Sequence, residues 1–139
     1  MRGVIVSGSA TESRVVPERI VYVEDDPNMR MIFREALERN GYQGVLVTCG
    51  SGQELLDRVK VLNPDLIVLD LKMPEMNGPD TLGALRQTEG AEVIPVLFLT
   101  GADRVVMTEQ YRQLGVIGVL HKPFNTATLF ETILTLYQT

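Results

Sequence analysis

Short apolar runs alternate with amphipathic segments from Arg19 to the end of the chain. The runs are rich in Val, Ile and Leu and have the length of strands. They are Ile20–Val23, Val45–Val47, Leu66–Leu69, Val93–Leu99 and Val116–Leu120. Such runs, separated by helical segments, are typical of βα units and predict a parallel sheet.

The first two helical segments have clear start and stop signals. Asp26 is placed to cap a helix that begins at Pro27 and ends at Asn40–Gly41. Its expected buried stripe is Met29, Ile32, Phe33, Ala36 and Leu37. A capping box, Ser51-Gly52-Gln53-Glu54, precedes a second helix that ends before Asn63–Pro64.

Three more helices are expected further along the chain. A short one carries Leu82 and Leu85, a less regular one runs from about Asp103 to Leu114, and the last is capped by Asn125. Together with the five runs, these helices account for the rest of the chain.

The arrangement of these elements follows from the hydrophobicity of the third run, Leu66–Leu69, which is apolar on both faces. Such a strand lies at the centre of a sheet that helices cover on both sides. Because right-handed crossovers place helices on both faces, we predict an α/β fold with a doubly wound five-stranded parallel sheet. We take strand order 2-1-3-4-5, one of the common orders of such sheets, as the hypothesis for the arrangement of its strands. Residues 18–139 would form this domain. Residues 1–17, rich in Ser, Gly and Thr and without helical period, are expected to be a flexible N-terminal arm.

Composition narrows the class of protein. A chain of 139 residues with 45% hydrophobic residues is the size of one domain with its own core. Cys49 is the only cysteine, so the chain has no internal disulfide, and we expect it to be a small buried or edge residue. No secretory signal pattern and no apolar run of about 18 residues is present, which favours a cytoplasmic protein that does not enter the membrane. The net charge of −5 disfavours direct binding to nucleic acid.

Acidic side chains follow the first and third predicted strands. Glu24 and Asp25 come after the first, and Asp70 after the third. In the predicted order these strands are neighbours, so their carboxylates meet at the carboxyl edge, where open α/β sheets bind ligands. Carboxylates so close together repel one another unless a cation lies between them. Mg²⁺, which takes oxygen ligands and keeps several waters, fits best.

The fourth and fifth strands add two more polar residues to the same edge. Thr100 can donate a hydrogen bond to a phosphoryl oxygen, and Lys122 supplies a compact positive charge. A cation site, a hydroxyl and a lysine together indicate phosphoryl chemistry rather than metal storage.

In this combination and order, the strand-end motifs resemble those of the receiver domain of two-component response regulators. The motifs are Val23-Glu24-Asp25-Asp26-Pro27, Leu69-Asp70-Leu71-Lys72-Met73-Pro74 with Asn77-Gly78, Leu99-Thr100-Gly101, and His121-Lys122-Pro123-Phe124. The resemblance covers about Glu18 to Thr139 and implies a flavodoxin-like fold.

The resemblance also implies a role for each site residue. Asp70 would be the phosphoacceptor, receiving a phosphoryl group from a phosphohistidine. Asp25 would ligate Mg²⁺ directly, Glu24 through water, and Lys72 through its backbone carbonyl. Thr100 and Lys122 would contact the phosphoryl group.

Three positions around Lys122 bear on the switch or the phosphotransfer that the resemblance implies. Many receivers have an aromatic residue three positions before the lysine, but this chain has Val119 there, so an aromatic gate is not expected. Lys122–Pro123 is a candidate cis peptide, because only a bond before proline adopts that form readily. His121, the only histidine, is expected to be structural or exposed rather than part of the phosphotransfer.

The partners implied are a sensor histidine kinase or a histidine phosphotransfer protein, and a downstream protein. The downstream protein would bind the face made by helix 103–114, strand 116–120 and the last helix, where Val105, Met107 and Tyr111 are candidate contacts; a homodimer is a further candidate. The protein would be a phosphoacceptor that loses its phosphoryl group by hydrolysis, not an enzyme that turns over a substrate.

Three alternatives remain open at this stage. A phosphate-blind receiver would serve only as a scaffold or dimerisation module. A phosphatase of the haloacid dehalogenase type also uses a strand-end aspartate, but Asp70 is followed by Leu71-Lys72 instead of the Asp-x-Asp pattern. A nucleotide- or flavin-binding module is less consistent with the acidic loop after the first strand.

Overall fold

The computed structural model describes residues 4–7, 13–101 and 107–138. Its strands are β1 (Val4–Ser7), β2 (Ser13–Val16), β3 (Arg19–Val23), β4 (Val45–Cys49), β5 (Leu66–Asp70), β6 (Val96–Thr100) and β7 (Val116–His121). Its helices are α1 (Pro27–Arg39), α2 (Gly52–Leu62), α3 (Gly78–Arg86), α4 (Glu109–Gln113) and α5 (Leu129–Gln138).

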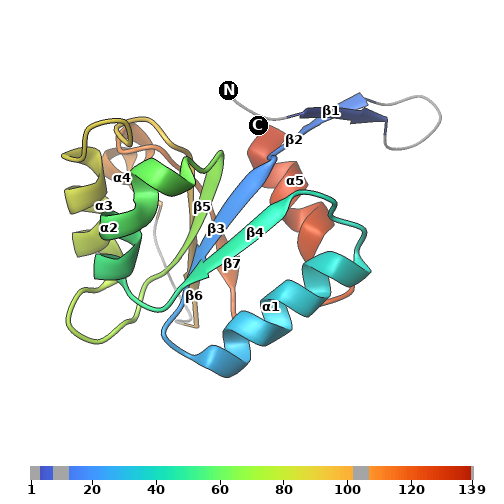
Figure 1. Cartoon of the computed structure of the whole chain (residues 1–139), viewed down its shortest axis with the longest axis horizontal. Coiled ribbons are helices and arrows are strands. Elements are labelled where there is room, and N and C mark those ends of the chain that lie inside the picture. Colours follow the sequence, from blue (N-terminus) through green and yellow to red (C-terminus); the bar gives the residue numbers. More distant parts are fainter. Residues whose placement is uncertain (1–3, 8–12, 102–106, 139) are drawn as a thin grey trace.

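Strands β3 to β7 form one parallel sheet in the order β4-β3-β5-β6-β7 (Figure 1). The sheet begins with β3, because β1 and β2 belong to a separate ribbon. Counted from β3 as the first strand, the observed order is 2-1-3-4-5, as predicted. The prediction of a doubly wound α/β fold is confirmed.

Helices cover both faces of the sheet, as Figure 1 shows: α1 and α5 lie on one face, and α2, α3 and α4 on the other. The core therefore has two layers. Val21 and Val23 of β3 pack toward α2 and α3, whereas Ile20 and Tyr22 pack toward α1 and α5. All residues of β5 are buried, as its apolar sequence predicted.

The predicted caps of the first two helices are present. Asp26 Oδ1 accepts a hydrogen bond from the N–H of Asn28 at 2.9 Å. Ser51 Oγ accepts one from the N–H of Glu54 at 3.0 Å, and Glu54 Oε1 accepts in return from the N–H of Gly50 at 2.9 Å. These bonds satisfy amides that a helix start leaves without partners.

Several predicted element boundaries, one predicted buried residue and one predicted helix cap were wrong. Strand β6 begins only at Val96, and Val93 is 87% exposed. Ile32, expected in the buried stripe of α1, is 42% exposed. Asn125 caps a turn before α5, accepting from the N–H of Ala127 at 2.9 Å. The predicted fourth helix, 103–114, is shorter than expected: α4 begins only at Glu109, after the cap Thr108, and residues 103–106 lie outside the described residues.

Strands β1 and β2 pair as an antiparallel ribbon within the segment predicted to be a flexible arm (Figure 1). The ribbon reaches the domain at β2, which lies against α5, where Gln138 Nε2 donates to the carbonyl of Val15. The ribbon has no counterpart among the elements predicted from the sequence, and the division of the chain between residues 17 and 18 stays a prediction.

Arg86 at the end of α3 joins the loop before β6 to the turn before β7. Its guanidinium donates to the carbonyls of Leu114 at 2.6 Å, Ala91 at 2.9 Å and Ile94 at 2.6 Å. Burial lowers the pKa of Arg86. Gly115 beside it has φ +85°, and a Cβ there would lie 2.6 Å from Arg86 Nη2, so the turn requires glycine for two reasons.

Cys49 at the end of β4 is fully buried, as predicted. Burial, followed by the charge of Glu54, raises the pKa of its thiol to about 11. None of the helices within the described residues is both long enough and apolar enough to cross a membrane.

Candidate functional site

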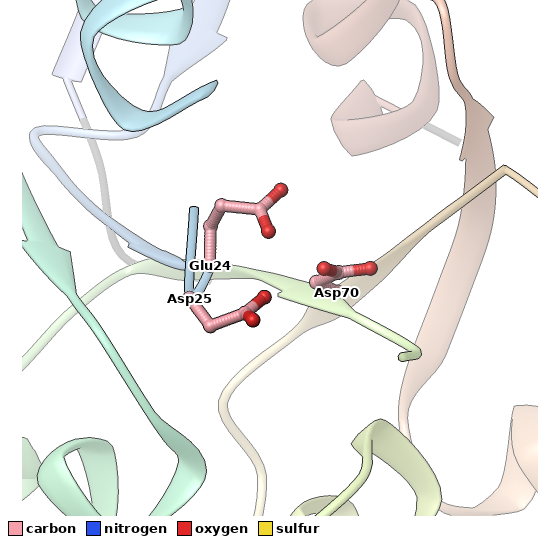
Figure 2. Close-up of side chains that lie close together, drawn as sticks. All are labelled: Glu24, Asp25 and Asp70. Atoms are coloured by element: carbon pink, nitrogen blue, oxygen red, sulfur yellow. The ribbon is translucent and has the colours of Figure 1, made fainter. Parts of the chain in front are cut away.

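The structure brings the three predicted carboxylates together at the carboxyl edge of the sheet. Glu24 and Asp25 follow β3, and Asp70 ends β5, the strand paired with β3. Ligand oxygens of the three lie within 4.8 Å of one another. Figure 2 shows the carboxylates of Glu24 and Asp25 turned toward the side where Asp70 lies. Glu24 and Asp70 are buried, and Asp25 is exposed.

Lys122 supplies a positive charge to this acidic group. Its Nζ lies 2.8 Å from Glu24 Oε1 and 3.2 Å from Asp70 Oδ2. Burial acts to lower the pKa of Lys122, but the hydrogen bonds and charges of Glu24 and Asp70 outweigh it, so the pKa is raised. The ammonium therefore carries its charge at neutral pH, and it bridges carboxylates from two strands.

The polar surroundings of Glu24 are well defined. The hydroxyl of Tyr22 donates to Glu24 Oε1 at 2.8 Å, and the N–H of Asp26 donates to Oε2 at 3.4 Å. Arg30 Nη1 donates to the backbone carbonyl of Glu24 at 2.7 Å. Burial, and then the charge of Glu24, raise the pKa of Tyr22 well above its usual range, so the phenol is a donor here.

Asp70 is held more loosely. Besides Lys122, it accepts a hydrogen bond from the N–H of Lys72 at 3.3 Å, and the Lys72 side chain is exposed. The loop after β5 returns close to the strand end, since a Cβ on Gly78 would lie 2.8 Å from the carbonyl oxygen of Asp70. This close approach explains why glycine begins α3.

Thr100 ends β6, next to β5, and is buried. The N–H of Lys122 donates to the carbonyl of Thr100 at 2.7 Å, which ties the ends of β6 and β7 together. Lys122–Pro123 is a cis peptide, as the sequence suggested. His121 is exposed, in agreement with the prediction.

The face of α4 and β7 includes Met107 and Tyr111, which the sequence predicts to be exposed contact residues. Val119 is half-buried and packs on the same core layer as Met107 and Tyr111. The Tyr111 ring contacts Phe98 edge-on, with centroids 5.2 Å apart. Met107 and Tyr111 are therefore partly buried rather than freely exposed, and Val105 lies outside the described residues.

The donor set fits a hard divalent cation. Carboxylate oxygens from three residues meet within one small volume, two of the residues are buried, and one lysine only partly offsets their charge. Mg²⁺ needs one or two protein carboxylates and keeps its remaining positions for water or phosphate, which the exposed Asp25 would allow.

Sequence reasoning missed Tyr22 and Arg30 as residues of this site. Tyr22 stands in the apolar run of the first predicted strand and was read only as part of the core. A usable signal was present, because a buried tyrosine hydroxyl needs a partner and Glu24, two positions later, lies on the same side of the strand. Arg30 gave no comparable signal.

The chain is similar to known proteins over most of its length. Residues 20–134 match the family model of the response regulator receiver domain. The chain is 30% identical over 129 residues to the transcriptional regulatory protein PdtaR of Mycobacterium tuberculosis, with 92% of this chain aligned. It spans 61% of PdtaR.

Two further proteins match nearly end to end. The polar-differentiation response regulator DivK of Brucella ovis is 32% identical over 114 residues, which cover 82% of this chain and 91% of DivK. The chemotaxis response regulator CheY4 of Vibrio cholerae superposes with a TM-score of 0.73 at 27% identity, covering 87% of this chain and 99% of CheY4. These matches agree with the predicted fold.

Proposed function

Because the chain belongs to the response regulator receiver domain family, we propose that it accepts a phosphoryl group on Asp70 in a Mg²⁺-dependent reaction. The observation that carries this proposal is the meeting of Glu24, Asp25 and Asp70 within 4.8 Å, with Lys122 bonded to two of them. The phosphoryl group would switch the protein's contacts with a partner.

The donor in this proposal is a phosphohistidine. An oxygen of the Asp70 carboxylate attacks phosphorus, an O–P bond forms, and the P–N bond to the imidazole breaks as that nitrogen leaves with its electron pair. The product is an acyl phosphate. When bound, Mg²⁺ would neutralise charge on the transferring oxygens, held by Asp25, Asp70, the Lys72 carbonyl and, through water, Glu24.

Lys122 and Thr100 would act on the phosphoryl oxygens. The Lys122 ammonium already touches Asp70 Oδ2 at 3.2 Å, so a short rotation of its flexible stem brings it to an oxygen of a group attached there. Thr100, at the end of the neighbouring strand, would donate its hydroxyl. Both residues add positive potential where negative charge increases during transfer.

The same proposal covers partners and location. A sensor histidine kinase or histidine phosphotransfer protein would supply the phosphoryl group, and a downstream protein would bind the face of α4, β7 and α5. Val119 is half-buried in that face, so we infer that switching works without an aromatic rotor at this position. The cytoplasmic location predicted from the sequence remains part of the proposal.

The test is phosphorylation by a small donor. Purified protein is incubated with acetyl phosphate, with and without Mg²⁺, and its intact mass is measured. We expect a gain of one phosphoryl group that requires Mg²⁺ and is absent from Asp70→Asn. Asp57→Asn is the matched control, because this exposed aspartate on α2 bonds only to Gln53 in the described chain.

No mass gain, from acetyl phosphate or from a phosphorylated histidine phosphotransfer protein, would contradict the proposal and support the phosphate-blind scaffold. Steady release of phosphate from phosphoesters would instead support a phosphatase. The family match disfavours that second result.

A further inference from the structure

Tyr22 is a fully buried tyrosine whose hydroxyl contacts the acidic site. It lies on β3 two positions before Glu24, so both side chains project from the same side of the strand. Its relative exposure is 0%, and its hydroxyl donates to Glu24 Oε1 at 2.8 Å. The bond is short enough to fix one carboxylate oxygen in place.

The ring of Tyr22 is held firmly. It stacks on Phe33 of α1 with centroids 3.9 Å apart and an interplanar angle of 18°. Phe33 in turn meets Phe124 edge-on at 5.8 Å. Because the ring is packed between the sheet and α1, the direction of its hydroxyl is set by the core rather than by the site.

The two donors on Glu24 Oε1 differ in freedom of movement. Lys122 Nζ, at 2.8 Å, sits on a flexible four-carbon stem and also contacts Asp70. The proposed phosphoryl contact needs that ammonium to turn away from Glu24. A buried carboxylate without a donor is costly, and the Tyr22 hydroxyl is the partner that stays on Oε1.

The two oxygens of Glu24 are used unequally. Oε1 accepts the bonds from Tyr22 and Lys122, whereas within the described chain Oε2 accepts one long bond of 3.4 Å from the N–H of Asp26. Oε2 therefore keeps capacity for another donor, such as a water bound to Mg²⁺.

We propose that Tyr22 is a positioning residue of the magnesium site, whose hydroxyl fixes Oε1 of Glu24 and leaves Oε2 for a metal-bound water. The inference rests on the magnesium-dependent function proposed above. Loss of a group that orients a metal ligand typically weakens metal binding by roughly 10- to 100-fold. Tyr22 acts through Glu24, which itself holds the metal through water, so removal of the hydroxyl is expected to weaken Mg²⁺ binding by up to about tenfold.

The experiment is a Mg²⁺ titration of ¹⁵N-labelled protein, followed by the backbone amide shifts of Asp25 and Lys72. The variants are Tyr22→Phe, Glu24→Ala and the double variant. Tyr22→Phe keeps the stacked ring, and the spectra show whether each variant is folded. Tyr42→Phe is the matched control. Its hydroxyl donates to the carbonyl of Pro17 at 2.8 Å, before the start of β3, whereas the acidic site lies beyond the end of that strand.

We expect Tyr22→Phe to raise the Mg²⁺ dissociation constant severalfold, up to about tenfold, in the wild-type background. In the Glu24→Ala background the same change should alter it by less than about twofold, because the hydroxyl then has no carboxylate to hold. Tyr42→Phe should leave it unchanged.

The inference would be overturned if the wild type and Tyr22→Phe bound Mg²⁺ with equal affinity. It would also be overturned if Tyr22→Phe weakened Mg²⁺ binding equally in the wild-type and Glu24→Ala backgrounds. If that happens while the wild type binds Mg²⁺ and gains a phosphoryl group, the proposed function stands and only the role of Tyr22 fails. If the wild type shows neither behaviour, the proposed function fails, and the role of Tyr22 with it.

Discussion

Strand β5 has a buried aspartate at each end, and the two are held in different ways. Asp65, just before the strand, accepts hydrogen bonds on Oδ2 from the N–H of Glu18 at 2.9 Å and of Arg19 at 3.0 Å. Asp70, the last residue of the strand, contacts Lys122 Nζ at 3.2 Å and the N–H of Lys72 at 3.3 Å. Relative exposure is 3% and 2%, so burial does not separate them.

The two aspartates differ in how freely their hydrogen-bond partners can move. Backbone amides at the start of β3 cannot leave Asp65 without loss of local structure, so that carboxylate is part of the scaffold. The ammonium of Lys122 can leave Asp70 by rotation of its stem, so this carboxylate can exchange one partner for another. The comparison shows that a buried acid is a candidate for chemistry when its partners can move.

The largest effect on stability is expected at the amino end of β5. Asp65→Ala removes an acceptor from two backbone N–H groups and should lower the free energy of unfolding by roughly 2 to 3 kcal/mol. Mg²⁺ affinity should stay at the wild-type value. Urea unfolding and a Mg²⁺ titration measure the two quantities, with the exposed Asp57→Ala as control.

If Asp65→Ala changed Mg²⁺ affinity as much as removal of Glu24 does, Asp65 would be coupled to the site. The contrast between the two aspartates would then be wrong. A loss of stability no larger than that of Asp57→Ala would show that the amide bonds of Asp65 contribute little.

An intermediate effect is expected for Lys122→Met. In Mg²⁺-free buffer the variant leaves Glu24 and Asp70 without their shared cation and should be less stable by roughly 1 to 2 kcal/mol, since the lysine is only partly exposed. The pKa of Lys122 is raised from 10.5 in the folded protein. Its contribution is therefore fully present below the ordinary lysine pKa of 10.5 and declines as pH rises through the raised pKa.

The measurement is urea unfolding of both proteins between pH 7 and pH 11.5. The difference in stability should be constant up to about pH 10 and then shrink. A difference that grows with pH in the alkaline range would mean that the ion pair does not account for it.

The smallest effect on stability is expected for Asp70→Asn. Unlike Asp65→Ala, this variant should be more stable than the wild type. Without Mg²⁺, removal of one of three neighbouring negative charges relieves repulsion, while Glu24 still holds Lys122. We expect a gain of about 1 kcal/mol at neutral pH, which added Mg²⁺ should reduce. A loss of stability in Mg²⁺-free buffer would show that the pair with Lys122 outweighs the repulsion.

Much of the site could be predicted because it lies at strand ends. Glu24, Asp70 and Lys122 each follow an apolar run, and a parallel sheet brings the carboxyl ends of its strands to one edge. The central place of the third strand followed from its fully apolar run, and 2-1-3-4-5 is one of the common strand orders of doubly wound sheets. No knowledge of side-chain packing was needed for either step.

The parts that could not be predicted depend on packing across elements. Val93 continues an apolar run but lies before β6 and is exposed, since the pairing begins at Val96. Ile32 has helical spacing but lines a surface hollow beside Thr126 rather than the core. The bond between Tyr22 and Glu24 is visible in sequence only when a buried hydroxyl is required to have a partner.

The three hydrogen bonds of Arg86 affect which parts of the molecule unfold together. One guanidinium is bonded to carbonyls in the loop before β6 and in the turn before β7, so loss of its three bonds frees both connections at once. The end of α3 and these two connections should therefore behave as one cooperative unit in local unfolding. A lysine could not replace it, because a single ammonium has no planar fork with which to span three fixed acceptors.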